Sequence, residues 1–208
     1  ILEKPILGHF SKGLAINEKE FITNLNLDKA IHLLINNSPG WGHWHYFNLP
    51  RIEFLLNLKL SKDIPVLIDK DLPIQAKQSL NLYFPDHPII EVDYFDRVHV
   101  KELYYPREAS FTPGYLKVNA NMDKIKSAVT TSYRALKFLR SMARSKAKRE
   151  NMINGPLYLS RKYTKRRLLS NRQYLDDLMT RNNFTEIFLE KLDFETQISY
   201  SVFAKKNL

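Results

Sequence analysis

The sequence predicts an α/β fold built on parallel β-sheets. Short apolar segments of strand length alternate with segments whose apolar residues recur at helical spacing, which is the pattern of strand–helix–strand units. Apolar residues make up 44% of the 208 residues, enough to bury a core, which argues against global disorder. The expected strands are residues 30–35, 64–68, 89–92, 98–103, 157–159 and 185–189.

The longest helical pattern divides the chain into domains. It covers residues 123–149 and ends in a cluster of cations, which are favourable at a helix C-terminus. A short amphipathic helix is predicted earlier, over residues 74–82. We therefore predict an N-terminal α/β domain over residues 1–122, a connecting helix over residues 123–150 and a smaller, partial α/β domain over residues 151–208.

A further helical pattern follows the first strand, over residues 44–56, where Pro50 either kinks the helix or begins a second one. His43 and His45 lie at this strand-to-helix junction, which in an open α/β sheet is the mouth of the ligand crevice. Either histidine could act as a general base or bind an oxyanion, and a hydrogen-bonded structural histidine is the commoner alternative. No third ligand is near in the sequence, so we predict no metal site.

The segment 156–173, PLYLSRKYTKRRLLSNRQ, combines a short apolar strand, a basic loop and the start of a helix. Ser170 and Gln173 have the spacing of a capping box, so the helix is expected to begin at Ser170. A later helix begins near Asp193, its expected N-cap. We expect no strand between that helix and Leu208.

Three arginines of this segment, Arg161, Arg166 and Arg167, follow the end of the strand. In an open α/β sheet the first residues after a strand face the ligand, together with the amides of the next helix. A guanidinium forms charge-assisted hydrogen bonds with anionic groups, so we interpret the loop as a phosphate-binding site. A solvated basic loop is the alternative.

The composition limits the classes of partner. Lys and Arg number 32 and Asp and Glu 22, a formal net charge of +10, which favours nucleotides, nucleic acid, acidic glycans or a lipid surface without choosing among them. The chain has no cysteine, so disulfides and thiolate metal sites are excluded. No apolar run approaches the ~20 residues of a membrane span. The six glycines form no Gly-rich phosphate loop, which argues against a kinase or a Rossmann dehydrogenase.

Three stretches, taken together, resemble glycosyltransferase family 61. LYLSRKYTKRRLLSNRQYLDDL resembles the family's strand ending in Ser-Arg, with a second Arg about five residues on, before a capped helix. NFTEIFLEKLDFETQISY resembles the two segments that follow, and GHWHYFNLPRIEFL resembles an upstream H-W-x-x-x-x-L-P-R segment. Their order and spacing fit over roughly residues 40 to 205.

The resemblance implies a glycosyltransferase of GT-B type, with two Rossmann-like lobes of which the second is incomplete here. It also implies a nucleoside-diphosphate sugar as donor, inversion of the anomeric centre, and no bound metal or other cofactor. Arg161 and Arg166 match the arginines expected at the donor diphosphate, with Arg167 and Ser170 beside them, and His43 matches the family's histidine. Without a metal, fixed cations and helix-end amides must neutralise the leaving diphosphate.

Several positions depart from the family pattern. Phe47 stands where the family often has an acidic residue, a candidate base, so the base is unassigned between His43 and His45. Thr196 replaces a Glu of the last motif, whose Gln is Gln197, a residue that either packs structurally or contacts the ligand. The family's downstream H-G-A segment does not occur before Leu208, so we expect a truncated chain that lacks part of the donor site.

The expected function is therefore transfer of a sugar from a nucleoside-diphosphate sugar to a glycan or lipid-linked saccharide acceptor. Two alternatives remain open: a non-catalytic basic module that binds nucleic acid or acidic glycan, and a degenerate, inactive relative. Binding to a phosphate backbone should weaken steeply with salt, whereas a shaped donor pocket should depend on salt much less. We expect the protein to be cytoplasmic. Peripheral association with a membrane surface is the alternative location.

Overall fold

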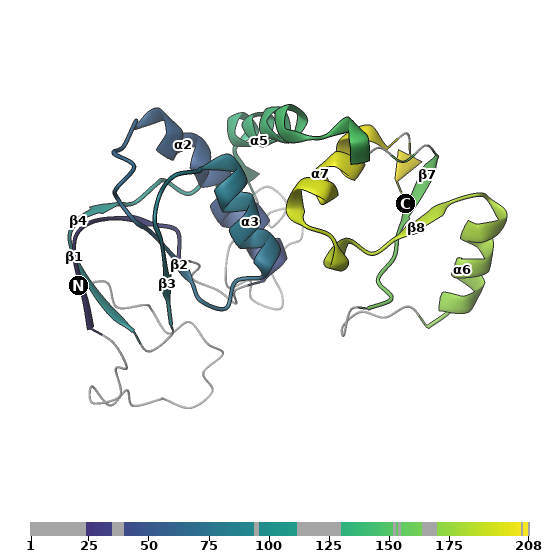
Figure 1. The fold of residues 1–208 in the computed structure, drawn as a ribbon, viewed down its shortest axis with the longest axis horizontal. Helices are drawn as coiled ribbons and strands as arrows, with labels where there is room; N and C mark the ends of the chain where they lie inside the picture. The colour runs from purple at the N-terminus through teal and green to yellow at the C-terminus, as the bar shows by residue number, and fades with distance from the viewer. Residues whose placement is uncertain are drawn as a thin grey trace, which may run out of the picture. The chain divides into compact units, whose positions relative to one another are not determined.

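The computed structural model describes residues 24–34, 40–93, 96–111, 130–151, 153, 155–163, 170–204 and 206–207, and confirms the α/β prediction for them. The chain divides into two compact units, Ile1–Leu139 and Arg140–Leu208, each of which contains a parallel sheet (Figure 1). No helix in the described ranges combines the length and the apolar character that crossing a bilayer requires.

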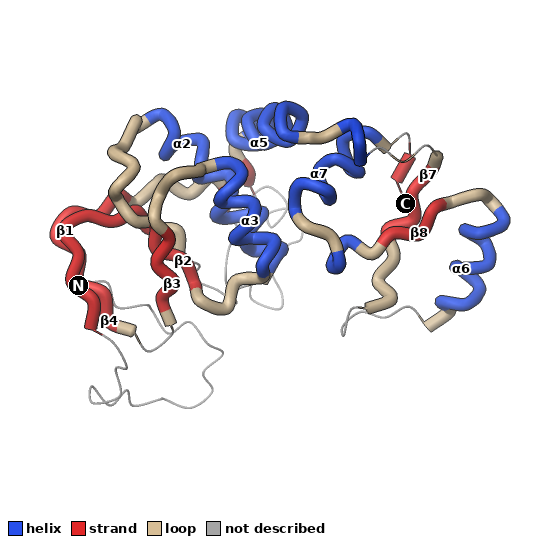
Figure 2. Tube along the Cα trace, viewed as in Figure 1, coloured by secondary structure: helices blue, strands red, loops and turns tan. Residues whose placement is uncertain are grey.

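The first unit contains a four-stranded sheet in which every pairing is parallel, as predicted. Its strands are β1 (Asn24–His32), β2 (Val66–Asp69), β3 (Ile89–Val92) and β4 (Arg97–Tyr104). The order across the sheet is β3-β2-β1-β4, so the strand order reverses at β1. Helix α3 (Ile74–Tyr83) connects β2 to β3, in agreement with the predicted helix (Figure 2).

Strand β1 begins six residues earlier than predicted. Its first residues pair only with β4, because β2 pairs with β1 just at Ile31 and His32. Exposed and half-buried residues alternate over this part of β1, whereas its last three residues are buried. The sequence pattern therefore showed only the fully buried end of the strand.

The core of the first unit lies on the sheet. All four residues of β2 are buried, and Ala30, Leu34, Leu67, Val92 and Val98 form one apolar cluster. Each large apolar side chain fully buried in such a cluster contributes about 1.5–3 kcal/mol relative to exposure. The parallel pairing of Ile31 with Tyr104 places the ends of β1 and β4 side by side.

A continuous helical run follows β1. It consists of α1 (Trp41–His43), a π-helical segment η2 (Trp44–Asn48), a 3-10 segment η3 (Leu49–Arg51) and α2 (Ile52–Asn57). The residues at the three junctions are all right-handed helical, so Pro50 neither ends the run nor starts a separate helix. Pro50 has no N–H to donate, and the change from π to 3-10 geometry accommodates it within the run.

The second unit contains a three-stranded parallel sheet of order β8-β7-β9. Strand β7 (Pro156–Leu159), helix α6 (Arg172–Arg181) and strand β8 (Thr185–Ile187) form one strand–helix–strand unit. A 3-10 turn, η5 (Leu189–Lys191), leads into α7 (Phe194–Phe203). The expectation that no strand follows this helix is wrong, because β9 (Lys206–Asn207) pairs with the start of β7.

The predicted helix over residues 123–149 is also wrong at its start. Thr130–Thr131 form a short strand, β6, that pairs antiparallel with β5 (Ser110–Phe111), and helix α5 extends only over Tyr133–Lys146. Residues 123–129 lie outside the described ranges. Two adjacent threonines, β-branched residues that favour strands, and Ser132 separate the helix from the preceding segment. The division between the two units falls within α5.

A buried hydrogen bond ties the helical run to α3. Trp44 has no exposed surface, and its indole Nε1–H donates to Ser79 Oγ over 2.8 Å. The Ser79 hydroxyl in turn donates to the carbonyl of Ala76 over 2.7 Å. This bond anchors the segment that carries His43 and His45.

Replacing Ser79 with Ala should lower the free energy of unfolding by about 1–3 kcal/mol, because the Trp44 indole N–H would stay buried without an acceptor. Chemical denaturation followed by tryptophan fluorescence measures the change. Ser141→Ala, at an exposed position of α5, is the matched control and should change stability little. Equal effects of the two substitutions would contradict the role given to this bond.

Candidate functional site

The ends of β7 and β8 lie side by side, because the two strands are parallel and Leu159 pairs with Ile187. Ser160, directly after β7, is buried, and its N–H donates to the carbonyl of Ile187 over 2.8 Å. Arg161 follows at the surface, at the carboxyl end of the strand, and its binding of an anion stays a prediction. The carboxyl edge of this sheet thus presents one arginine of the predicted phosphate site, whereas Arg166 and Arg167 lie outside the described residues.

Arg172, a residue that sequence reasoning missed, organises this edge. Its Nη2 donates to Ser160 Oγ over 3.1 Å and to Glu186 Oε1 over 3.0 Å, and its Nε donates to Asp176 Oδ2 over 3.0 Å. The guanidinium therefore links the first turn of α6 to the ends of both strands and pairs with two carboxylates at once. The i, i+4 spacing of Arg172 and Asp176 was the one sequence signal for it.

An aromatic cluster covers the neighbouring part of the edge. The Tyr163 ring packs edge-on against Phe188 with the ring centroids 4.8 Å apart, and Lys191 Nζ lies 3.3 Å from the Tyr163 centroid. The Tyr163 N–H donates to Glu190 Oε1 over 3.3 Å. About half of the Tyr163 surface, 49%, stays exposed. The loop after β7 is thereby fixed against the turn after β8, with a half-exposed aromatic ring two residues from Arg161.

The predicted capping box at Ser170 is wrong. The N-cap of α6 is Asn171, which makes no capping hydrogen bond with its side chain, and Ser170 lies outside the helix. Gln173 is thus the second helical residue rather than the third, and its Nε2 donates to Asp177 Oδ1 over 3.0 Å instead of reaching back. Ser170 remains exposed.

Gln197 has a structural position. Its side chain is buried, and Nε2 donates to the carbonyls of Leu189 and Leu192 over 2.8 and 3.1 Å, which holds the η5 turn. The predicted N-cap Asp193 is confirmed, since Oδ1 accepts from the Thr196 N–H over 2.7 Å. The Thr196 hydroxyl also donates to Asp193 Oδ2 over 3.0 Å, so threonine supports this cap where the family has glutamate.

The two histidines of the first unit differ in environment. His43 is exposed on α1, with its ring centroid 6.0 Å from that of Phe47, one turn later. His45 is half-buried, packs edge-on against Trp41 at 3.9 Å, and its Nδ1 lies 3.4 Å from the Trp41 carbonyl oxygen. Burial lowers the pKa of His45. His43 is therefore the more accessible of the two histidines, and His45 is a packing residue.

A buried polar network joins the ends of β1 and β4, where the strand order reverses. The Arg51 guanidinium, 3% exposed, donates from Nε to the carbonyl of Pro106 over 3.0 Å and from Nη1 to Asn48 Oδ1 over 3.0 Å. Asn48 Nδ2 donates to the carbonyl of Leu33 over 2.6 Å. The centroid of the Tyr105 ring lies 4.8 Å from the Arg51 guanidinium and 5.0 Å from the centroid of the His32 imidazole.

A pocket of ≈540 Å³ lies in the first unit, beside the segment that follows β4. Thr131, on its wall, donates from Oγ1 to the Tyr46 hydroxyl over 2.7 Å, which connects the pocket to the helical run of the H-W motif. The Ser110 hydroxyl is buried and has no hydrogen-bond partner among the described residues. The pocket is lined by Phe54, Arg107, Glu108, Ala109, Ser110, Thr131 and Ser132.

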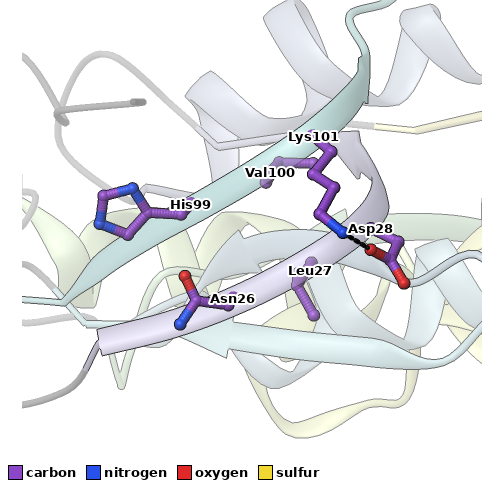
Figure 3. A pocket seen from close by; sticks show the side chains of 6 residues that line it. All are labelled: Asn26, Leu27, Asp28, His99, Val100 and Lys101. Atoms are coloured by element: carbon purple, nitrogen blue, oxygen red, sulfur yellow. Dashed lines mark ion pairs between the residues drawn. The ribbon is translucent and has the colours of Figure 1, made fainter.

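A smaller hollow of ≈250 Å³ lies over the amino-terminal halves of β1 and β4 (Figure 3). The ion pair between Lys101 Nζ and Asp28 Oδ1, 2.6 Å long, runs along one side of it, and both side chains are 82% exposed. Ligands of open α/β sheets bind at the carboxyl ends of the strands. This hollow lies away from those ends, and we assign it no function.

The sequence interpretation that the chain lacks a D-x-D triplet, and with it a metal-chelating nucleotide-sugar site of that kind, is wrong about the triplet, because Asp69-Lys70-Asp71 closes β2. Its first carboxylate, on Asp69, is buried, whereas Asp71 is exposed and the intervening Lys70 pairs with Asp93 over 2.8 Å. Within the described part of the chain, no three His, Cys, Asp or Glu side chains come together as a set of metal ligands.

The network at β1 and β4 predicts sensitivity to acid. Burial, and to a lesser extent the Arg51 charge, lower the pKa of His32 from 6.5 to about 4. The unfolded chain therefore binds a proton on this residue below pH 6.5, whereas the folded chain does so only near pH 4. Stability contributed by neutral His32 is complete above pH 6.5 and is lost as the pH falls toward 4, by about 3 kcal/mol.

Denaturation of the His32→Gln variant at pH 7 and at pH 4 tests this prediction. Between pH 7 and pH 4, the free energy of unfolding should fall less in the variant than in the parent chain, by up to about 3 kcal/mol. His43→Gln, at the exposed histidine, should leave the acid sensitivity unchanged. An acid sensitivity that is the same in His32→Gln and in the parent would show that His32 does not titrate between these pH values.

Arg172→Gln should destabilise the chain by about 1–2 kcal/mol, because it removes charge-assisted hydrogen bonds to partly buried partners that solvent screens in part. Urea denaturation followed by circular dichroism measures the loss. Arg181→Gln, in the last turn of the same helix, should cost much less. A smaller effect of Arg172→Gln than of this control would rule out the organising role of Arg172.

Comparison with known proteins identifies the family of the chain. The family model described as Glycosyltransferase 61 matches residues 41–205, which include the helical run of His43 and the whole strand–helix–strand unit of Arg161. No curated protein and no solved structure matched the chain. The match covers most of the sequence and agrees with the order of the three motifs. The chain belongs to glycosyltransferase family 61.

Proposed function

We propose that the chain transfers a sugar from a nucleoside-diphosphate sugar to a glycan or lipid-linked saccharide, with inversion of the anomeric centre and without a metal or other cofactor. The observation that carries the proposal is the position of Arg161, exposed at the carboxyl edge of a parallel sheet, inside the region that matches the family. The same proposal takes the two units as lobes of GT-B type.

The electrostatics around Arg161 support diphosphate binding. Nearby carboxylates are already engaged: Asp176 and Glu186 pair with Arg172. Lys162 is exposed next to Arg161, so two cationic side chains follow one another directly after Ser160. A guanidinium and an ammonium group at this edge form charge-assisted hydrogen bonds with a departing diphosphate in this proposal.

The aromatic cluster supports a nucleotide at the same edge. A nucleobase has a flat face that stacks on an aromatic ring, and the half-exposed ring of Tyr163 offers one two residues from Arg161. Arg161 would then bind the diphosphate and Tyr163 the base. Arg166 and Arg167 are further diphosphate ligands in this proposal, and Gln197 acts through the η5 turn that it holds.

His43 is the proposed base, because Phe47 cannot accept a proton and His45 is used in packing. In the proposed reaction, His43 takes the proton of an acceptor hydroxyl, and the hydroxyl oxygen attacks the anomeric carbon. The bond from that carbon to the diphosphate oxygen breaks, and the diphosphate leaves with the electron pair. The pocket beside β4, with its hydroxyl, carboxylate and guanidinium groups, is the proposed place for the acceptor.

The proposed location is the cytoplasm, with peripheral contact to the membrane where the acceptor is lipid-linked. A basic module for nucleic acid or acidic glycan and an inactive relative are the competing functions. The +10 net charge favours the former, and Phe47 in place of an acidic residue favours the latter.

Arg161→Ala should abolish stabilisation of the chain by its preferred nucleotide, because a ligand that binds only the folded state raises the melting temperature. Melting temperatures are measured with UDP, GDP, dTDP and their sugar conjugates, at low and moderate salt. The parent chain should respond selectively to one nucleoside diphosphate and keep the response at moderate salt. Arg181→Ala, which removes an exposed arginine of α6, is the control and should respond as the parent does.

Two outcomes would contradict the proposal. An unchanged nucleotide response in Arg161→Ala would show that the diphosphate binds elsewhere. No nucleotide response in the parent, together with salt-sensitive binding to a DNA duplex or heparin, would leave the basic module as the function.

A further inference from the structure

We propose that the outward face of helix α5 binds the surface of an anionic lipid bilayer. Four residues define this face, which we call the α5 basic stripe: Tyr133, Lys137, Arg140 and Arg144. They are spaced by four, three and four positions, so they lie along one side of the helix, over about 16 Å at 1.5 Å per residue. Figure 1 shows α5 as one continuous helix.

The charge of α5 has one sign. Its sequence, YRALKFLRSMARSK, contains five Lys or Arg and no Asp or Glu. Arg134 is engaged by Glu53 over 2.6 Å, and Lys148, just beyond the helix, pairs with Glu195 over 2.8 Å. By contrast, the three cations of the α5 basic stripe are exposed and form no ion pair with any described residue.

The opposite side of α5 is used for packing. Ala135 is completely buried, and the other apolar residues of that side are partly buried: Phe138, Leu139, Met142 and Ala143. The helix therefore does not insert its apolar side into a bilayer. It presents the α5 basic stripe to the solvent, so contact with a membrane would be made by cations at the level of the lipid head groups.

Two large side chains at the start of the stripe favour a lipid surface over nucleic acid. Tyr133 is 79% exposed and Leu136, beside it on the helix, is 48% exposed. Tyrosine rings are favourable at the boundary between head groups and acyl chains. Transfer of an exposed leucine side chain from water into this boundary is also favourable, because it buries apolar surface. A phosphate backbone would use the cations but offers no apolar layer for Leu136. The inference does not depend on the transfer reaction, because lipid binding requires neither donor nor acceptor.

Co-sedimentation of the full chain with lipid vesicles tests the proposal. The chain should bind vesicles of phosphatidylcholine with phosphatidylglycerol, bind pure phosphatidylcholine weakly, and dissociate as salt rises. The triple variant Lys137→Gln/Arg140→Gln/Arg144→Gln should bind the anionic vesicles roughly 100-fold more weakly, the factor given by about 1 kcal/mol per cation. Glutamine keeps the helix propensity, and circular dichroism confirms folding.

The matched control removes the same net charge elsewhere. It replaces three exposed lysines that are paired with Asp86, Asp93 and Asp28: Lys62→Gln/Lys70→Gln/Lys101→Gln. The control should bind anionic vesicles within a few-fold of the parent. Equal weakening by the two triple variants would show that net charge alone drives binding and would overturn the proposal, as would equal binding of the parent to neutral and anionic vesicles.

A second variant separates lipid from nucleic acid. Tyr133→Gln/Leu136→Gln should weaken binding to anionic vesicles roughly 10-fold, since both side chains lose their contact with the lipid boundary. Its binding to a DNA duplex, measured at the same salt, should not change. If the parent binds the duplex more tightly than the vesicles and this variant changes neither, the stripe is a nucleic-acid surface and the lipid proposal is wrong.

Discussion

The parallel pairing of β7 with β8 is the constraint on which the candidate donor site depends. Because both strands point the same way, Ser160 and Phe188 leave the sheet at one edge, and the loop of Arg161 meets the turn of Lys191. Arg172 then fixes this edge by binding a hydroxyl and two carboxylates at once. An arginine used in this way serves structure, whereas Arg161 is exposed at the same edge of the sheet.

Buried and exposed cations have different roles in this chain. Arg51 lies inside the first unit, where burial lowers its pKa and its hydrogen bonds go to a carbonyl and an asparagine rather than to a carboxylate. A charge held in this way ties the ends of β1 and β4 together at the cost of its hydration. The three cations of the α5 basic stripe are exposed, keep their hydration and remain available to an external anionic surface. The net charge of +10 therefore includes cations that hold the fold together and cations that face the solvent, and composition alone does not tell the two kinds apart.

Local patterns predicted the parts of the fold that local sequence controls. Strand 89–92 and the N-cap Asp193 were predicted correctly, since short apolar runs and capping side chains act within a few residues. The amino-terminal half of β1, strand β6 and strand β9 were missed because each exists through pairing with a strand distant in the sequence. The predicted capping box placed the N-cap of α6 at Ser170, one residue before its actual position at Asn171. The roles of Arg51 and Arg172 emerged only from tertiary contacts, although both lie inside the motifs that indicated the family.

The central claim is that a nucleoside diphosphate binds at the carboxyl edge of the β7–β8 sheet. Amide chemical shifts of the isotopically labelled chain, recorded while the nucleotide is added, test this most directly. We predict that the largest shifts occur at residues 160–163 and 188–191, with saturable dependence on nucleotide concentration. Shifts confined to the cations of α5, growing without saturation and vanishing with salt, would contradict the claim and show that the nucleotide meets only a basic surface.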